Sequence, residues 1–259
     1  MRKDVFISIC VVLSSCFSVP ESTEQKIAYD EYTLSQFVKT SATQSLSIST
    51  PFLDSVLIKA GTDSIVFHKT VNYLTRAYAD PNSSFRNEIF YDKILKAQMD
   101  SKWNTDWVKK EAIRKRHLLH QNDVGSLANN FEYLAPNGQK RSMHNLKANY
   151  ILLFFYNPEC HACKEMKATL LRSSIIRNAI LDGKLKILSV YTDADLSVWY
   201  KHLLEFPSNW LQGRDNDRYL YKNDIYDLRA IPTIYLLDQH KKVILKDCTS
   251  INELEGKIQ

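Results

Sequence analysis

The stretch "FFYNPECHACKEMKATLL", residues 154–171, carries two cysteines three residues apart, Cys160 and Cys163. It begins inside the continuously apolar run 150–156, which is typical of a strand buried on both faces of a sheet. A helical pattern follows and predicts a helix from about Cys160 to Leu181. The sequence therefore predicts that both cysteines lie where a buried strand passes into the first turn of a helix.

The first turn of a helix favours a reactive thiol. Residues three apart on a helix share a face, roughly 5–6 Å apart at Cβ, which is compatible with a disulfide. Met166 and Leu170 continue the apolar stripe of Cys163, so Cys163 should face the core and Cys160 the exposed helix end. There, free backbone N–H groups and the helix dipole favour a thiolate. We therefore predict that Cys160 is the nucleophile of disulfide exchange and Cys163 the resolving thiol.

Other uses of the cysteine pair fit the sequence less well. A structural zinc site needs four ligands, and the pair with neighbouring His161 leaves the fourth unidentified. The spacing of His144 and Cys248 supports neither as that ligand. Covalent haem attachment needs a histidine directly after the second cysteine, where this chain has Lys164. We therefore predict no metal site and no cofactor.

The N-terminus has the layout of a secretory signal. Arg2 and Lys3 precede a short apolar run, Val5–Leu13, that is too short to span a bilayer. The end of this run, "LSSC" at residues 13–16, resembles a bacterial lipobox, in which Cys16 becomes the lipidated residue after cleavage. Ordinary signal cleavage, with Cys16 incidental, is the alternative. We predict a signal peptide at 1–15, a lipid-anchor tether at 16–23, and a lipoprotein of the cell envelope that faces the periplasm or sits on the outer membrane.

Composition bears on whether the protein binds nucleic acid and on whether the cysteine pair is structural or reactive. The net charge is +5, and the densest basic cluster, Lys109–Arg116, has helical periodicity and no recognition motif, so we predict no nucleic-acid binding. Disulfides persist outside the cytoplasm, but a bridge that closes a three-residue loop adds little stability. The pair is therefore predicted to perform chemistry.

Two regions follow each other along the chain. Residues 24–122 read as helices and predict an all-α N-terminal domain, with helix starts expected at Thr50–Pro51 and Thr62. Residues 125–259 alternate strand and helix, which predicts an α/β domain with a mixed central sheet flanked by helices. Its predicted elements are a hairpin of 131–134 and 139–142, strands at 150–156 and 184–191, a helix capped by Asp193, and a hairpin of 231–237 and 242–245.

The motifs of the second region resemble those of the thioredoxin superfamily. Cys160-His161-Ala162-Cys163 follows an apolar strand, and Ala230-Ile231-Pro232-Thr233 precedes another strand about seventy residues later. The resemblance covers about residues 125–259. Gly138, Leu146 and Lys147-Ala148-Asn149 are similar to the approach to the first central strand in the extracytoplasmic branch related to TlpA and ResA. With the helical first half, the chain resembles two-part thioredoxin-like lipoproteins of Bacteroides-type bacteria.

The resemblance implies a thiol–disulfide oxidoreductase and a site for its substrate. It implies that Pro232 is cis and lies beside the redox pair, although trans is the commoner state of an X–Pro bond. Ile231 would then contribute to the substrate groove, and His161 is a further candidate substrate-binding residue. The implied partners are cysteine-containing exported proteins and a membrane thiol reductant or oxidant.

The chain also departs from the family pattern. Phe154 stands where many thioredoxins have a buried aspartate that assists proton transfer from the second cysteine, and Glu159 replaces the usual tryptophan. A peroxidase of the peroxiredoxin type is a rival interpretation, but Asn157 replaces its usual threonine. The other rival is a ligand- or partner-binding lipoprotein that uses the thioredoxin-like domain as a scaffold.

Overall fold

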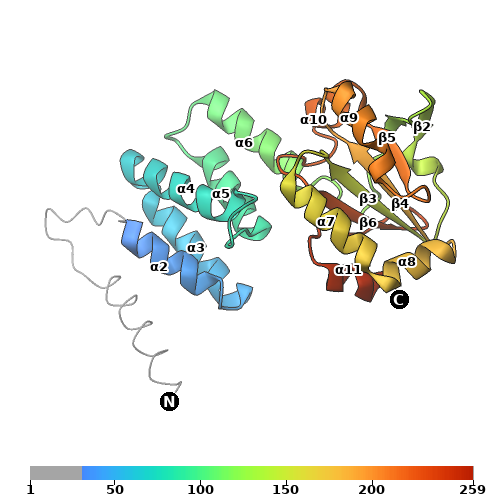
Figure 1. Cartoon of the computed structure of the whole chain (residues 1–259). Helices are drawn as coiled ribbons and strands as arrows, with labels where there is room; N and C mark the ends of the chain where they lie inside the picture. Colours follow the sequence, from blue (N-terminus) through green and yellow to red (C-terminus); the bar gives the residue numbers. More distant parts are fainter. Residues whose placement is uncertain (1–30, 259) are drawn as a thin grey trace, which may run out of the picture. The chain divides into compact units, whose positions relative to one another are not determined.

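The structure, a computed structural model, describes residues 31–258 (Figure 1). The predicted signal peptide, tether and lipidated Cys16 lie outside the described residues. By its internal contacts the chain divides into two compact units, Met1–Tyr73 and Leu74–Gln259, while the change from helices to strands falls between Leu119 and Glu132. Across residues 31–258, no helix has the length and apolar character needed to cross a membrane.

The first unit is helical, with two differences from the predicted helix starts. Its helices are α2 (Glu31–Ser41), α3 (Leu46–Ala60) and the beginning of α4 (Ser64–Ala79). Pro51 lies inside α3 and not at its start, because Ser45 is the N-cap and a proline at this point removes a single helical hydrogen bond. Asp63, and not Thr62, begins α4, since its Oδ1 accepts from the N–H groups of Ile65 and Val66.

The second unit begins with further helices. α5 (Glu88–Asp100) and α6 (Asp106–Leu119) are capped by the side chains of Asn87 and Thr105. The two helices share a small apolar core with the end of α4, formed by Ala79, Tyr91, Leu95, Ala112 and Leu119.

Within the described residues the strands form one seven-stranded sheet of order β2-β1-β5-β4-β3-β6-β7. β3 pairs parallel with β4 and antiparallel with β6, and β4 pairs parallel with β5, so the sheet is mixed as predicted. Antiparallel β1–β2 and β6–β7 pairs confirm both predicted hairpins. The strands are β1 (Glu132–Leu134), β2 (Lys140–Ser142), β3 (Tyr150–Tyr156), β4 (Leu185–Tyr191), β5 (Leu211–Arg214), β6 (Thr233–Asp238) and β7 (Val243–Leu245).

Strand β3 is buried on both faces, as its apolar run predicted. Leu152, Phe154 and Tyr156 belong to the core under the helices, while Ile151, Leu153 and Phe155 belong to the core of the opposite face. α7, α8 and α11 lie on one side of the sheet (Figure 1). The helices of this region are α7 (His161–Arg172), α8 (Ser174–Leu181), α9 (Leu196–His202), α10 (Tyr219–Lys222) and α11 (Ile251–Ile258), with 3-10 turns at Met143–Asn145, Leu203–Glu205 and Asn216–Arg218.

Two helix boundaries here differ from the prediction. The expected helix from Cys160 to Leu181 is two helices, because Ser173 leaves the helical conformation and its hydroxyl accepts from the Ile176 N–H to begin α8. Asp195, and not Asp193, caps the helix of Trp199, since its Oδ1 accepts from the N–H groups of the next turn. Strand β5 was not predicted.

A network of charged groups joins the helical segment to the end of β7. The Nζ of Lys246 lies 2.7 Å from Asp123 Oδ1 and 3.3 Å from Glu88 Oε2, and its side chain is 8% exposed. His120 continues the network, with Nδ1 3.0 Å from Asp123 Oδ2 and Nε2 2.8 Å from Asp92 Oδ1. Both ring nitrogens therefore face carboxylates, which suits the protonated imidazolium, a donor at both positions.

Gly213 of β5 lies against Tyr133 of the β1–β2 hairpin, so a substitution at Gly213 tests this packing. A Cβ at this position would lie 2.9 Å from Cγ of the Tyr133 ring and still closer to Cδ2, and Tyr133 is buried. We therefore expect Gly213→Ala to lower the free energy of unfolding by about 1–3 kcal/mol in urea unfolding. Gly256 in α11 has open space around it, so Gly256→Ala should instead stabilise the protein by about 0.5–1 kcal/mol. Equal effects of the two changes would contradict this packing.

His120 should make stability depend on pH. Its hydrogen bond with Asp92 is the largest cause that raises the pKa of His120, Asp123 adds to it, and burial opposes it. A raised histidine pKa stabilises the fold below the unfolded value of about 6.5, and this contribution is lost as pH rises through the folded pKa. We expect His120→Gln to lower the free energy of unfolding by about 0.5–1 kcal/mol at about pH 5.5 and by less at about pH 8.

The pH comparison isolates the histidine. Burial alone would raise the pKa of Asp92 and Asp123, but their hydrogen bonds to cationic side chains lower it, so both stay ionised at either pH. The exposed His117, whose ring contacts Gln121, supplies the matched control, and His117→Gln should behave as the wild type. A loss in His120→Gln that is the same at both pH values would contradict the predicted contribution.

Candidate functional site

The structure places Cys160 at the N-cap of α7, directly after the turn that ends β3. Its Sγ accepts a hydrogen bond from the Cys163 backbone N–H at 3.3 Å, and the Lys164 N–H donates to the Cys160 carbonyl at 3.1 Å. Cys160 is half-buried, and Cys163 is 2% exposed within the core beneath it. This is the arrangement predicted from the apolar stripe of the helix. Cys160, Cys163 and Cys248 are all free thiols.

Asn157 shapes the turn between β3 and α7. Its Oδ1 accepts from the Glu159 N–H at 2.8 Å, and its carbonyl accepts from the Cys160 N–H at 3.1 Å. Its Nδ2 donates to Asp193 Oδ2 at 3.1 Å, which ties the turn to the loop after β4. Sequence reasoning did not give Asn157 this role. The signal that points to it is the Asn157-Pro158 dipeptide, since Asn-Pro favours a turn with the asparagine side chain as acceptor.

Burial holds Cys163 in the thiol form. Removal from water is the largest cause that raises the pKa of the Cys163 thiol well above its ordinary value, and the hydrogen bond with Cys160 raises it further. The backbone N–H of Asn157 acts in the opposite direction. None of these groups is a carboxylate, and Phe154 is a fully buried member of the surrounding core. Proton transfer from Cys163 is therefore not assisted by a side chain at the Phe154 position.

The Ile231–Pro232 peptide lies beside the cysteine pair. It is cis, as the family resemblance implied. The Cys160 thiol donates to the Ile231 carbonyl oxygen at 3.6 Å, so the segment before the proline lies against the exposed sulfur. The hydroxyl of Thr233 donates to the Ala230 carbonyl at 2.6 Å and braces this loop where it enters β6. The structure thus brings Cys160, Cys163, Ile231 and Pro232 together.

The side chains that flank the first cysteine are exposed. Glu159 and His161 both face solvent, and His161 Nε2 lies 3.2 Å from Glu165 Oε1 on the next turn of α7. The predicted substrate-binding role of His161 is thus compatible with its exposure and remains a prediction. Cys248 is a buried thiol at the end of the last hairpin, and burial raises its pKa to about 11.

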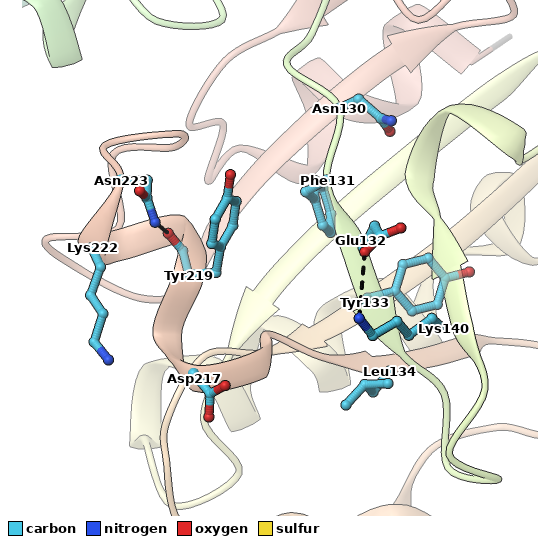
Figure 2. A pocket seen from close by; sticks show the side chains of 10 residues that line it. All are labelled: Asn130, Phe131, Glu132, Tyr133, Leu134, Lys140, Asp217, Tyr219, Lys222 and Asn223. Carbon is cyan, nitrogen blue, oxygen red and sulfur yellow. Dashed lines mark hydrogen bonds and ion pairs between the residues drawn. The ribbon is translucent and has the colours of Figure 1, made fainter.

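A cavity of about 510 Å³ lies apart from the cysteine pair, between the β1–β2 hairpin and α10 (Figure 2). Lys140 and Lys222 stand on opposite sides of it, and Lys140 pairs with Glu132. Cys160, Cys163, Ile231 and Pro232 do not line it, so its size does not make it the site of thiol chemistry. In the described part of the chain, no three His, Cys, Asp or Glu side chains are grouped as a metal site would require.

The arrangement of the two sulfurs is suited to disulfide exchange. A half-exposed sulfur at a helix N-terminus is reachable by an incoming disulfide, while its buried partner is protected from solvent until the first sulfur has reacted. The neighbouring Ile231 carbonyl offers a backbone acceptor at the point where a substrate chain would approach Cys160.

Two of the solved structures that are similar to this chain come from Bacteroides species. A thioredoxin-like protein from Bacteroides caccae ATCC 43185 is 30% identical, with a TM-score of 0.71, over 93% of this chain and 97% of that chain. The C-terminal domain of an uncharacterized protein from Bacteroides fragilis NCTC 9343 is 42% identical, with a TM-score of 0.51, over 53% of this chain and 97% of that one. The first similarity thus includes the helical region as well as the sheet. No protein-family profile and no curated protein matches the sequence.

The different burial of the three described thiols should appear in their alkylation. We expect brief treatment of the reduced native protein with iodoacetamide near neutral pH to modify Cys160 at least about tenfold faster than Cys163 or Cys248, because burial keeps the latter two protonated and covered. Mass spectrometry of the peptides carrying these residues measures the order, and labelling in denaturant gives the matched control. Labelling of Cys163 as fast as Cys160 in the native protein would contradict the geometry.

Proposed function

The chain belongs to the thioredoxin superfamily, and from this premise we propose that it is a thiol–disulfide oxidoreductase that exchanges disulfides with protein substrates through Cys160 and Cys163. The observation that carries the proposal is the position of the Cys160 sulfur, which is half-buried at the start of α7 and 3.6 Å from the Ile231 carbonyl beside the cis proline. Cys163 lies directly beneath it in the core.

In the reducing direction the exchange has two steps. The Cys160 thiolate attacks one sulfur of the substrate disulfide, so a mixed disulfide forms and the other substrate sulfur leaves as a thiolate. Cys163 then loses its proton and attacks the Cys160 sulfur, which forms the Cys160–Cys163 disulfide and releases the second substrate thiolate. The substrate gains two electrons and the cysteine pair loses them. The same steps in reverse oxidise a substrate dithiol.

The hydrogen bond at the helix start supports the first step. In the thiolate form, the Cys160 sulfur keeps the Cys163 N–H as a donor, and a donor to the charged form stabilises that form. The second step is opposed by the burial that raises the pKa of Cys163, and the Asn157 backbone N–H is the neighbouring group that favours its thiolate. The hydrogen bond to Cys160 therefore favours formation of the mixed disulfide, while the burial of Cys163 opposes its resolution.

The setting of this activity is part of the proposal. The charged and apolar segments of the first fifteen residues, followed by Cys16, support export and lipid anchoring in the cell envelope. Cysteine-containing exported proteins would be the substrates. A membrane thiol reductant or oxidant would return the pair to its starting state, because the exchange leaves it in the opposite redox form.

Serine variants test the roles of the two cysteines. We expect Cys160→Ser to reduce dithiol-dependent insulin reduction to the uncatalysed rate, because serine supplies no thiolate. Cys163→Ser should still attack but trap mixed disulfides, visible as adducts on non-reducing gels. Cys248→Ser is the matched control and should keep full activity, since the Cys248 thiol contacts the Ser250 carbonyl and the Glu253 carboxylate and is not hydrogen-bonded to either cysteine of the pair. Full activity of Cys160→Ser would reject the proposed function and favour a binding role for the fold.

A further inference from the structure

A second cavity, of about 370 Å³, lies between α6 and residues 221–229, and we call it the α6 pocket. One wall is the basic face of α6, part of the cluster Lys109–Arg116, and the other is the segment that leads to the cis proline. The uncharged residues of its lining are leucines and tyrosines. The charged residues of the lining are Arg114, Lys115, Lys222, Asp224 and Arg229.

One residue of the pocket lining, Arg229, belongs to the segment that leads to the loop beside Cys160. Arg229 precedes Ile231 by two residues, so their Cα atoms are at most ~7 Å apart. The Ile231 carbonyl in turn lies 3.6 Å from the Cys160 sulfur. The Arg229 backbone at the edge of the pocket is therefore only a few residue lengths from a polypeptide chain bound at Cys160.

Both walls of the pocket are held in place before any partner binds. The Tyr226 hydroxyl donates to the Asn129 carbonyl at 2.8 Å, and the Ile225 carbonyl accepts from the Asn122 side chain at 2.8 Å. Arg114 joins the two walls, because its Nη1 lies 2.8 Å from both carboxylate oxygens of Asp224. A preformed pocket costs little ordering entropy when it is filled.

Two of the four cations are already paired. Arg114 gives its remaining donors to Glu111 at 2.8 and 2.9 Å, so its guanidinium is bound on both sides. The Arg229 guanidinium binds Asp227 at distances from 2.6 to 3.1 Å. These two arginines are therefore structural, and they leave little capacity for a further anion.

Lys222 is the cation without a counter-ion. Lys115 lies 3.8 Å from Glu111, but no carboxylate of the described residues lies within ion-pair distance of the Lys222 ammonium. Lys222 is exposed and stands at the boundary between the α6 pocket and the cavity of Figure 2, which Asp217 lines. Three carboxylates pair with the cations of the lining, namely Glu111, Asp224 and Asp227. The four cations therefore exceed their carboxylate partners by one positive charge, that of Lys222.

We propose that the α6 pocket binds an acidic side chain of the protein substrate, a few residues from the cysteine that Cys160 attacks, with Lys222 as its counter-ion. The inference rests on the proposed function and adds a substrate class to it. The apolar and aromatic lining takes the neighbouring part of the substrate chain, and the positive charge selects aspartate or glutamate over a neutral residue.

Two synthetic peptides test this inference. Each is closed by one disulfide, and they differ only in carrying aspartates or asparagines beside the cysteines. Reduction by the full chain, with a small dithiol as electron donor, should show a kcat/KM about two- to fivefold higher for the aspartate peptide at low salt, the effect of one exposed charge pair. High salt should remove the preference. Lys222→Glu should reverse it, while Lys257→Glu, an equal charge change at an exposed position of α11, should keep it.

The outcomes separate the two proposals. A preference that Lys222→Glu reverses and Lys257→Glu keeps supports the α6 pocket. Reduction of both peptides at the same rate, or the same response in the two variants, overturns the pocket inference and leaves the oxidoreductase intact. Reduction of neither peptide overturns both.

Discussion

The hydrogen bond from the Cys163 backbone N–H to the Cys160 sulfur is the interaction on which the candidate site depends. Helix N-caps are usually oxygen acceptors from Ser, Thr, Asp or Asn, and here a sulfur takes that position. The atom that begins α7 is therefore also the atom proposed to react. The position of this helix start depends on β3. Burial on both faces holds the strand in place, and the turn at Asn157 leads from its end directly to Cys160.

The parts of the fold that the sequence predicted are those that local patterns encode. The apolar run of β3 and the hairpin of 131–134 and 139–142 are predicted from local patterns that tertiary contacts reinforce, and the structure has both elements there. The half-exposure of Cys160 and the burial of Cys163 are predicted from their spacing in the helix. The cis state of Pro232 does not, because local chemistry favours trans, and only the resemblance to a family indicated it.

The missed features depend on contacts that no local pattern encodes. β5 is four residues long and contains Gly213, a weak strand former that is required here because the Tyr133 ring occupies the space of a side chain. Ser173 divides one apolar helical pattern into α7 and α8, although the periodicity continues across it. The α6 pocket was missed for a similar reason, since its walls come from helix and loop segments about a hundred residues apart in the sequence.

Phe154 stands where many thioredoxins have a buried aspartate, and this difference increases the importance of substrate contacts in the α6 pocket. Without a carboxylate at this position, Cys163 reaches its thiolate against the full cost of burial, and the Asn157 N–H only partly offsets that cost. On the proposed mechanism the mixed disulfide is then resolved more slowly than in a site with a buried base. A slowly resolved intermediate holds the substrate chain against the Ile231 loop for longer. During this time the substrate thiolate released in the first step can attack the mixed disulfide and reverse it. On the proposed mechanism, contacts away from the sulfurs, such as one between Lys222 and an acidic side chain, therefore influence which substrates complete the exchange.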